Sequence, residues 1–273
     1  MKATNAVRVN KAKIVTLDIE TSPLEAYAWG LWDVNVGLEQ IKTEWSILSF
    51  AAKWFGESKV IYKDAGGRGA SKVRDDKHLL KAIWDILDEA DIVIAQNGKK
   101  FDMKKINARL ILLGFPPYSP VRVIDTYEAA KKHFAFTSNK LAWTSRYLTD
   151  EEKEKHKLFP GFELWSECLK DNPKAWGEMK KYNIKDIVAT EKYYIKLRPW
   201  IKNHPNMGIY ADGEVPTCPK CGGTHLQRRG VAVSQTTRYT RYQCTDCGGW
   251  SRAKIMLNTL KQRRASLVNI SEE

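Results

Sequence analysis

The stretch KIVTLDIETSP, residues 13–23, decides the fold of the chain. Its first seven residues are mostly apolar and β-branched, with polar residues on both sides, and this pattern predicts a strand over 13–19. Because side chains alternate across a strand, Asp18 and Glu20 lie on the same face at its end. Open α/β sheets form their sites at the ends of strands, and two like charges there require a cation or a proton.

The rest of the N-terminal part alternates between apolar strands and amphipathic helices. Helical spacing of apolar residues predicts helices over 77–90 and 101–113. From about 125 to 197 the sequence is typical of helices, broken at Pro160-Gly161 and Asn172-Pro173. Short apolar segments predict four further strands, at 46–54, 59–62, 91–96 and 121–124. This order favours an α/β fold with a mixed five-stranded sheet flanked by helices.

The composition excludes some classes of protein. The 273-residue chain is 43% hydrophobic, enough for a sizeable core, and it has no apolar run of the roughly 18 residues that cross a bilayer. Its first residues, MKATNAVRVNKAK, lack an apolar h-region, so we expect no secretory signal and a reducing compartment. The net charge of +13 favours a nucleic-acid partner, although a solvated basic surface explains it equally well.

Two further acidic segments follow predicted elements. Asp102 closes the segment NGKKFD and opens a helix, where its charge also suits the helix macrodipole. Tyr182 and Asp186 are four residues apart on a predicted helix and therefore share one face, which for a solvated helix needs no function. Together with Asp18 and Glu20 these carboxylates form a hard-oxygen set suited to Mg²⁺ or Mn²⁺.

The three segments, taken in order, resemble the motifs of the DnaQ-like DEDD exonuclease superfamily, in the subclass whose third motif carries tyrosine. The resemblance covers about residues 13–200 and rests on DIETSP at 18–23, QNGKKFD at 96–102 and YNIKD at 182–186, with support from IDT at 124–126 and SNKLAWTSRYL at 138–148. It implies a ribonuclease H-like fold and removal of nucleotides in the 3′→5′ direction.

The resemblance also implies a role for each matching residue. Tyr182 orients the attacking water, and two Mg²⁺ or Mn²⁺ ions activate that water and stabilise the leaving 3′ oxygen, so no protein nucleophile is needed. The two ions are held by the four carboxylates, Asp18, Glu20, Asp102 and Asp186.

Other matching positions are expected around the substrate. Asn97 and Phe101 shape the second motif, and Thr21 and Leu24 lie near the terminal nucleotide. Asp125 is either an auxiliary acid or the N-cap of the next helix.

The long insertion between Pro23 and Trp45 departs from the family pattern that we expect. It contains Trp29, Trp32 and Trp45. These indoles either stack on bases or cover a hydrophobic face of the domain, and we favour the second interpretation.

The C-terminal part contains a cysteine pattern typical of a metal site. Two C-x2-C pairs lie 22 residues apart, in CPKCGG at 218–223 and CTDCGGW at 244–250. In a reducing compartment such pairs bind metal more often than they form disulfides. The pattern is similar to a zinc ribbon, in which four thiolates hold one structural Zn²⁺. His225 is a spare ligand that four cysteines do not need, and Cys168 is expected to be a small core residue. The predicted zinc ligands are Cys218, Cys221, Cys244 and Cys247.

We therefore expect an exonuclease domain over residues 1–200, a linker over 201–214 and a zinc ribbon with a basic tail over 215–273. The last segment has ten basic residues against three acidic ones. Basic residues interleaved with tyrosines between the cysteine pairs suit a nucleic-acid strand, although a structural or protein-binding module is the alternative. The predicted nucleic-acid contacts there are Arg228, Arg229, Arg238 and Arg241.

The function expected from the sequence is a 3′→5′ exonuclease on single-stranded or frayed DNA ends, in replication or repair. An RNA exonuclease or a structure-specific endonuclease of the same fold is the first alternative. A nucleic-acid-binding protein with an inactive nuclease domain is the second, and the intact set of four carboxylates argues against it.

Overall fold

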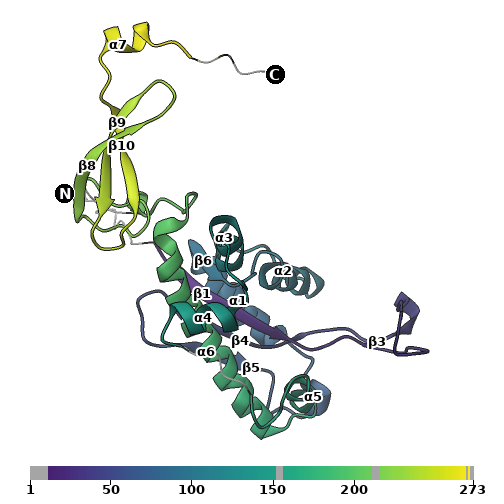
Figure 1. Ribbon diagram of the computed structural model, residues 1–273. Coiled ribbons are helices and arrows are strands. Elements are labelled where there is room, and N and C mark those ends of the chain that lie inside the picture. The colour runs from purple at the N-terminus through teal and green to yellow at the C-terminus, as the bar shows by residue number, and fades with distance from the viewer. Residues whose placement is uncertain (1–11, 152–155, 211–214, 269, 271–273) are drawn as a thin grey trace, which may run out of the picture. The chain divides into compact units, whose positions relative to one another are not determined.

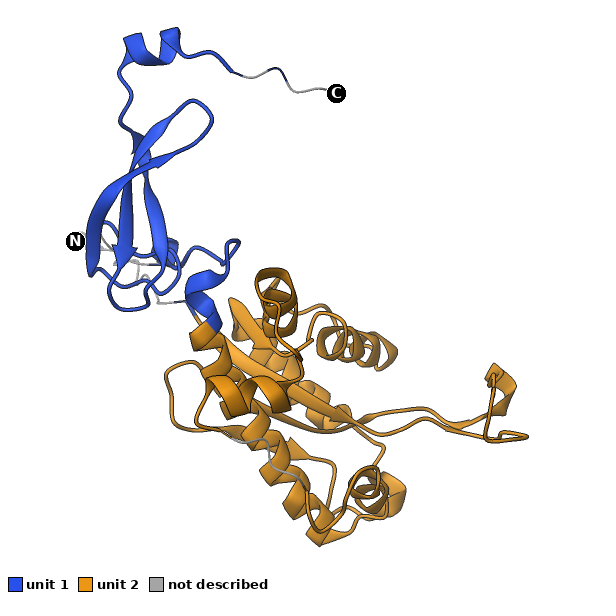
Figure 2. Ribbon diagram, viewed as in Figure 1, with its two compact units in different colours: residues 1–12, 197–273 blue, residues 13–196 orange. Residues whose placement is uncertain are grey.

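The computed structural model describes residues 12–151, 156–210, 215–268 and 270. Two compact units are distinguished in Figure 2. One consists of residues 13–196, which we call the sheet unit, and the other contains residues 197–273 together with 1–12. We call the second the ribbon unit, and each unit is described by itself.

The sheet unit is built on a mixed five-stranded sheet (Figure 1). Its central strand β1 pairs antiparallel with β4 and parallel with β6, so the direction of pairing changes at β1. Further out, β4 pairs antiparallel with β5 and β6 pairs parallel with β7. In sheet order the strands are β5 (Ile61–Asp64), β4 (Ile47–Trp54), β1 (Ile14–Thr21), β6 (Ile92–Ala95) and β7 (Arg122–Asp125). The sheet predicted from the sequence is thus confirmed.

One face of the sheet buries a continuous apolar core. From β1, Val15, Leu17 and Ile19 point into it, as alternation along the strand requires. Helices α1 (Lys77–Glu89), α2 (Asp102–Leu112) and α5 (Glu163–Leu169) supply the other side of this core. Asp18 and Glu20 therefore project from the opposite face of β1, away from the main apolar cluster.

The second face is covered by helices α3 (Thr126–His133), α4 (Leu141–Leu148) and α6 (Pro173–Leu197), whose buried residues include Ala130, Leu141, Ile187 and Tyr193. The expected breaks at Pro160-Gly161 and Asn172-Pro173 precede α5 and α6. Further breaks separate α3 from α4 and follow α4.

The insertion after β1 forms an arm that projects from the sheet, and we call residues 23–45 the arm (Figure 1). Short strands β2 (Glu25–Ala26) and β3 (Ile41–Thr43) pair along it, with the 3-10 helix η1 (Leu38–Gln40) between them. The side chain of Arg74 fastens its base, with Nη2 2.5 Å from Glu25 Oε1. A second 3-10 helix, η2 (Ala70–Lys72), precedes Arg74.

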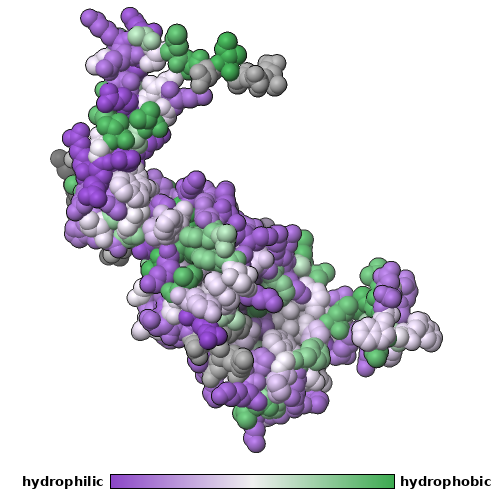
Figure 3. Space-filling model, in the orientation of Figure 1, coloured by the Kyte–Doolittle hydropathy of each residue, from purple (hydrophilic) through white to green (hydrophobic). Residues whose placement is uncertain are grey.

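The tryptophans of the arm differ in burial. Trp29 is 100% exposed and Trp32 is 87% exposed, so neither covers a hydrophobic face of the sheet unit. Figure 3 shows pale and apolar side chains along this projecting segment. Trp45, at the base, is half-buried, and the Lys105 ammonium lies 3.7 Å from the centre of its ring. The covering role that we favoured from the sequence therefore does not fit Trp29 and Trp32.

The ribbon unit holds a three-stranded antiparallel sheet in the order β10 (Trp250–Met256), β9 (Arg238–Cys244) and β8 (Leu226–Val233). Strands β8 and β9 lie between the two cysteine pairs along the chain, and β10 follows the second pair. Short helices η3 (Arg198–Trp200), η4 (Met207–Tyr210) and α7 (Leu260–Ala265) complete the unit. Across both units, none of the helices that the structure describes is long and apolar enough to cross a membrane.

A buried ion pair joins α2 to the start of α1. Asp76 is completely buried, and it accepts hydrogen bonds from Arg109 Nε at 2.9 Å and Nη2 at 2.7 Å. The backbone N–H of Ile47 donates to the same carboxylate at 2.9 Å. The charge of Asp76 is thus paired with that of Arg109, and both carboxylate oxygens accept hydrogen bonds.

Removing this carboxylate should be costly, because Arg109 would keep a largely buried charge without its partner. We expect Asp76→Ala to lower the free energy of unfolding by about 3–5 kcal/mol, measured by urea denaturation. The matched control is Asp85→Ala, which breaks the exposed pair with Lys81 and should cost less than about 1 kcal/mol. Equal losses in both variants would contradict this account of the pair.

Candidate active site

Three carboxylates from two elements meet at the end of the central strand. Asp18 and Glu20 come from β1, and Asp186 comes from α6. One oxygen from each of the three lies within 4.8 Å of the others. Residues almost 170 positions apart in the chain are therefore brought together, as the sequence predicted for this part of the acidic set.

The cluster fits a small divalent cation. Oxygen ligands of Mg²⁺ lie about 2.0–2.1 Å from the ion, so neighbouring ligands are roughly 3–4 Å apart, and closure of about 1 Å completes the site. Without a cation, each pair of these charges repels by roughly 3 kcal/mol at an effective dielectric constant near 20. The donor set is entirely carboxylate oxygen, which suits Mg²⁺ or Mn²⁺.

The orientation of Asp18 is set by two polar side chains. Asn183 Nδ2 donates to Asp18 Oδ2 at 2.6 Å, and Ser49 Oγ on β4 donates to Asn183 Oδ1 at 3.2 Å. Both Ser49 and Asn183 are fully buried. Sequence reasoning missed Asn183, although it lies inside the quoted segment YNIKD, next to Tyr182.

Asp102, the fourth predicted carboxylate, lies in the same pocket but outside the three-oxygen cluster. It is almost completely buried, and its Oδ1 accepts a hydrogen bond from the backbone N–H of Ile19 at 3.0 Å. Burial raises the pKa of Asp102 to about 7, against the lowering effect of that hydrogen bond. Its carboxyl is thus held on the backbone of the strand that carries Asp18 and Glu20.

A tight turn before α2 brings Asp102 to this position. Asn97 has a φ of 63°, in the left-handed region, which asparagine tolerates better than most residues. Gly98 is required for a different reason, because a Cβ there would lie 2.3 Å from the Cβ of Ala95 on β6. The start of α2 therefore approaches the sheet as closely as the backbone allows.

Asp125 has a structural role in the same turn. Its carboxylate accepts hydrogen bonds from the backbone N–H groups of Asn97 and Lys99, at 3.0 and 3.1 Å. It also caps α3, accepting from the N–H groups of Tyr127 and Glu128. Of the two interpretations left open from the sequence, the N-cap is the one that these contacts match.

The carboxylates line an open pocket of about 540 Å³. Tyr182 lies in its wall, one helical turn before Asp186, and packs edge-on against His156 and Trp165 at 5.3 and 6.1 Å between ring centres. Asn97 and Phe101 line the pocket as expected. Sequence reasoning missed further lining residues, some of them in the quoted stretches QNGKKFD and SNKLAWTSRYL: Gln96, Tyr127, Lys140, Leu141 and Ala142.

Thr21 and Leu24, expected near a terminal nucleotide, do not line this pocket. Thr21 is the last residue of β1, and Leu24 is exposed at the base of the arm. Their predicted contact with substrate stays a prediction.

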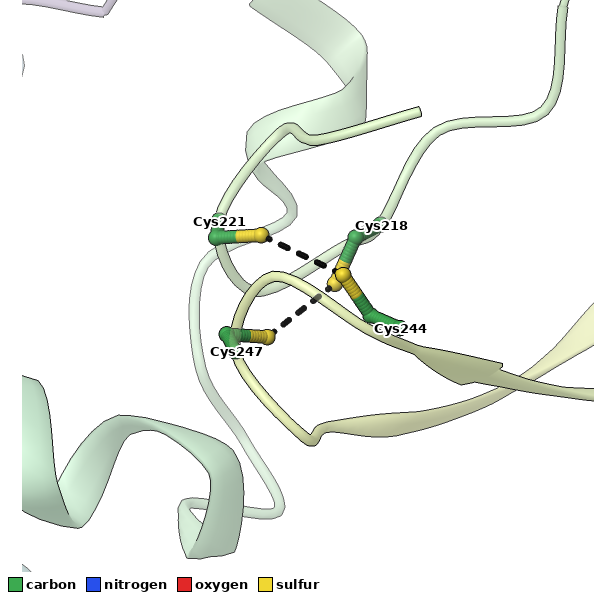
Figure 4. Close-up of side chains that lie close together, drawn as sticks. All are labelled: Cys218, Cys221, Cys244 and Cys247. Atoms are coloured by element: carbon green, nitrogen blue, oxygen red, sulfur yellow. Dashed lines mark hydrogen bonds between the residues drawn. The ribbon is translucent and has the colours of Figure 1, made fainter. Parts of the chain in front are cut away.

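The four cysteines of the ribbon unit form a second candidate metal site (Figure 4). The Sγ atoms of Cys218 and Cys247 are 3.7 Å apart, and those of Cys221 and Cys244 are 3.6 Å apart. Thiolates placed tetrahedrally about 2.3 Å from Zn²⁺ would be about 3.8 Å from one another. The observed spacing therefore fits one tetrahedral ion.

The two cysteine turns have the same construction. Gly222 and Gly248, directly after the second cysteine of each pair, have φ values of 76° and 75°, which glycine adopts without strain. His225 is not part of the cluster, and its Nδ1 lies 2.8 Å from Asp246 Oδ1. Cys168 is fully buried in the apolar core of the other unit.

Strand register separates the four arginines predicted to contact nucleic acid. Arg228 lies opposite Tyr242, and Arg238 lies opposite Val233, so both are on the face of β9 that carries Tyr242. Arg241 is on the other face. Arg229 lies at the irregularity of β8 between Arg228 and Val231. The prediction that these side chains bind nucleic acid stays a prediction.

Comparison with known proteins agrees with this architecture. The model of the RNase_H superfamily matches residues 15–198. Among solved structures, the chain is similar to the family B DNA polymerase from the hyperthermophilic archaeon Pyrobaculum calidifontis, with a TM-score of 0.52 and 16% sequence identity. That similarity covers 69% of this chain and 25% of the polymerase, so the chain spans about a quarter of it. No curated protein matches the sequence.

A mixed five-stranded sheet with carboxylates at the end of its central strand defines a ribonuclease H-like fold. The chain belongs to the RNase_H superfamily. Membership supports a nuclease of this fold, a class that uses divalent metal ions and binds nucleic acid.

Like-charge repulsion at the site gives a test that needs no enzymatic activity. We expect Glu20→Gln to raise the free energy of unfolding by at least about 1 kcal/mol without added Mg²⁺ or Mn²⁺, because it removes the repulsion of one charge by two others, which is about 1 kcal/mol per pair even at the dielectric constant of water. For a unit of this size that corresponds to a melting temperature about 2–4 °C higher. Added Mn²⁺ should stabilise the parent protein and not the variant, in thermal melts. A variant that is less stable than the parent without metal would contradict the clustering of the charges.

The raised pKa of Asp102 predicts a dependence of stability on pH. In the folded state the group keeps its proton up to about pH 7, whereas an unfolded aspartate loses it near pH 4. Its contribution to stability is therefore fully present below about pH 4 and is lost as pH rises through about 7. We expect Asp102→Asn to remove this component, so that the difference in unfolding free energy between variant and parent changes between pH 4.5 and 7.5. Urea denaturation without Mg²⁺ or Mn²⁺ measures it, and a constant difference would contradict the shift.

Proposed function

We propose that the chain is a metal-dependent 3′→5′ exonuclease of the DEDD type, in the tyrosine subclass. The observation that supports this most directly is the meeting of Asp18, Glu20 and Asp186 in one pocket with Tyr182 in its wall. Asp102 lines the same pocket from the start of α2 and completes the set of four carboxylates.

Each residue has a role that its position supports. The carboxylates of Asp18, Glu20, Asp102 and Asp186 hold the metal ions. Two divalent cations, when bound, supply the Lewis acidity that activates water and stabilises the leaving 3′ oxygen. The phenol of Tyr182 orients the water, and Asn183 keeps Asp18 in the ligating orientation.

The pocket has room for the terminal nucleotides of a nucleic-acid strand. Its volume of about 540 Å³ and its open form suit a strand end. Phe101, exposed at its edge, offers a ring on which a base stacks, and Lys140 offers a positive charge to a phosphate. The substrate contacts of Thr21 and Leu24 belong to the same proposal, at the base of the arm.

DNA is the favoured substrate, because one similar solved structure is a DNA polymerase. We propose a role in replication or repair, and for a stand-alone exonuclease we propose the cytoplasm of a bacterial or virus-infected cell as its location. An RNA exonuclease and a structure-specific endonuclease use the same carboxylate chemistry, so the products decide among them.

The ribbon unit assists by binding nucleic acid in this proposal. One structural Zn²⁺ held by the four cysteines would fix the two turns and the sheet that follows them. The domain limits that we propose are 1–200 for the exonuclease, 201–214 for the linker and 215–273 for the ribbon, close to the boundary between the compact units at residues 196 and 197.

The decisive experiment follows a 5′-labelled oligonucleotide, as DNA and as RNA, with Mg²⁺ or Mn²⁺. An exonuclease gives a ladder of products shortened from the 3′ end, and DNA should be degraded faster. We expect Asp18→Asn to lower the rate at least 10³-fold, because it removes a ligand charge. Gel analysis of timed samples measures both results.

The matched control is Asp85→Asn, which makes the same charge change on α1, outside the pocket, and should leave the rate unchanged. A discrete fragment in place of a ladder would indicate an endonuclease. Absence of any product from the parent protein, or full activity in Asp18→Asn, would overturn the proposal.

A further inference from the structure

The sheet of the ribbon unit carries its charged and aromatic residues on two different faces. Arg252 on β10 lies directly opposite Arg241 on β9, and Trp250 lies opposite Gln243. Since side chains alternate along β9, Tyr239 is on the same face as Arg241. We call this the arginine face, and it contains Tyr239, Arg241, Trp250 and Arg252.

Each arginine on this face lies over an aromatic ring of the neighbouring strand, within cation–π distance. The guanidinium carbon of Arg252 lies 3.7 Å from the ring centre of Tyr239, and that of Arg241 lies 5.2 Å from the ring centre of Trp250. Stacking holds a guanidinium group in a defined plane and leaves its N–H groups at the edge of that plane. The two groups are thus arranged before any ligand arrives.

The direct pairing of two arginines is unfavourable by itself. Like charges opposite each other across two strands destabilise a sheet, and no carboxylate among the residues that the structure describes forms an ion pair with Arg241 or Arg252. Their hydrogen bonds go to backbone carbonyls, from Arg241 Nε to Arg229 at 2.8 Å and from Arg252 Nη1 to Ala253 at 3.3 Å. The remaining N–H donors are available to an anion that would relieve the repulsion.

We infer that the arginine face binds the backbone of a single-stranded nucleic acid, with one phosphate at each of Arg241 and Arg252. Trp250 is 48% exposed beside them and offers a stacking surface that only an unpaired base can use. A strand of repeating phosphates supplies a separate negative charge to each of the two arginines, which a single small anion does not. This inference rests on the proposed function, and it names which surface of the ribbon unit meets the substrate.

The opposite face provides a matched control, because the inference assigns the contacts to Arg241 and Arg252 and withdraws Arg228 and Arg238 from the wider set predicted from the sequence. Arg228 on β8 and Arg238 on β9 carry the same charge and are exposed in the same sheet, but they lie on the face of Tyr242. If net charge alone determined the affinity for nucleic acid, removing either pair of arginines would weaken binding equally. If the arrangement of the guanidinium groups matters, removing Arg241 and Arg252 would weaken binding more.

The test uses the full chain and a fluorescein-labelled 20-nucleotide oligo(dT), without Mg²⁺ or Mn²⁺ so that the strand stays intact. Fluorescence anisotropy at several salt concentrations gives the affinity and its salt dependence. We expect Arg241→Gln with Arg252→Gln to weaken binding at least tenfold and to reduce the slope of log K against log salt by about 1.4, since each phosphate contact on a single strand contributes about 0.7.

The other variants separate the two parts of the inference. Trp250→Ala should weaken binding at least fivefold with little change of slope, and a 20-base-pair duplex should be insensitive to it. Arg228→Gln with Arg238→Gln should change the affinity less than threefold. Metal content of each variant, measured by mass spectrometry, reports that the cysteine site is intact.

Equal losses from the two arginine pairs, or no loss from either, would overturn the inference. The nuclease itself is tested separately with the p-nitrophenyl ester of thymidine monophosphate, which has a single phosphate, in the presence of Mn²⁺. Loss of binding in the Arg241→Gln, Arg252→Gln variant with hydrolysis of this ester unchanged supports the inference. If the parent protein binds oligo(dT) as expected but hydrolyses neither the ester nor an oligonucleotide, the proposed function is contradicted and the inference about the arginine face is still supported.

Discussion

Repulsion among the carboxylates at the end of β1 is the constraint on which the sheet unit depends. Asp18, Glu20 and Asp186 each place one carboxylate oxygen within 4.8 Å of the others. No apolar contact offsets the repulsion among these three charges. It is maintained because β1 is the central strand, paired on both sides, and because its other face is fixed in the main core. Asn183 and Ser49 add a buried hydrogen-bonded link from α6 and β4 to Asp18. The scaffold therefore holds the charges in place, and a cation is the partner that makes the arrangement favourable.

Groups of one kind are also brought close together in the ribbon unit. Four sulfur atoms converge at a spacing suited to one tetrahedral ion, and two arginines occupy directly opposite positions on neighbouring strands. In each case the fold brings together groups of one kind that are more stable with a ligand of opposite charge. In the function that we propose, metal ions bind the carboxylates and the thiolates, and a polyanion binds the arginines. The net charge of +13 is consistent with this division, because the basic excess is concentrated where the ligand is anionic.

Much of this arrangement was predictable from the sequence. The strand at 13–19 is β1, and the carboxylates were placed on one face by alternation alone. The tyrosine and aspartate of α6 share a face because they are four residues apart. The features that could not be predicted from the sequence depend on contacts between residues that are far apart in the chain. The role of Asn183 requires knowing that α6 crosses beside Ser49, and exposure of Trp29 and Trp32 requires knowing that the arm leaves the sheet. The faces of the ribbon arginines follow from the register, which is irregular on both outer strands.

The contact between Gly98 and Ala95 has a consequence for which substitutions the chain tolerates. A Cβ at position 98 would come within 2.3 Å of Ala95, so even alanine forces the first turn of α2 away from β6. Asp102 begins that turn and is joined to the backbone of Ile19. A change of one methyl group would therefore displace Asp102, which we propose as a metal ligand, without altering any charge. The constraint on this glycine is one of space alone.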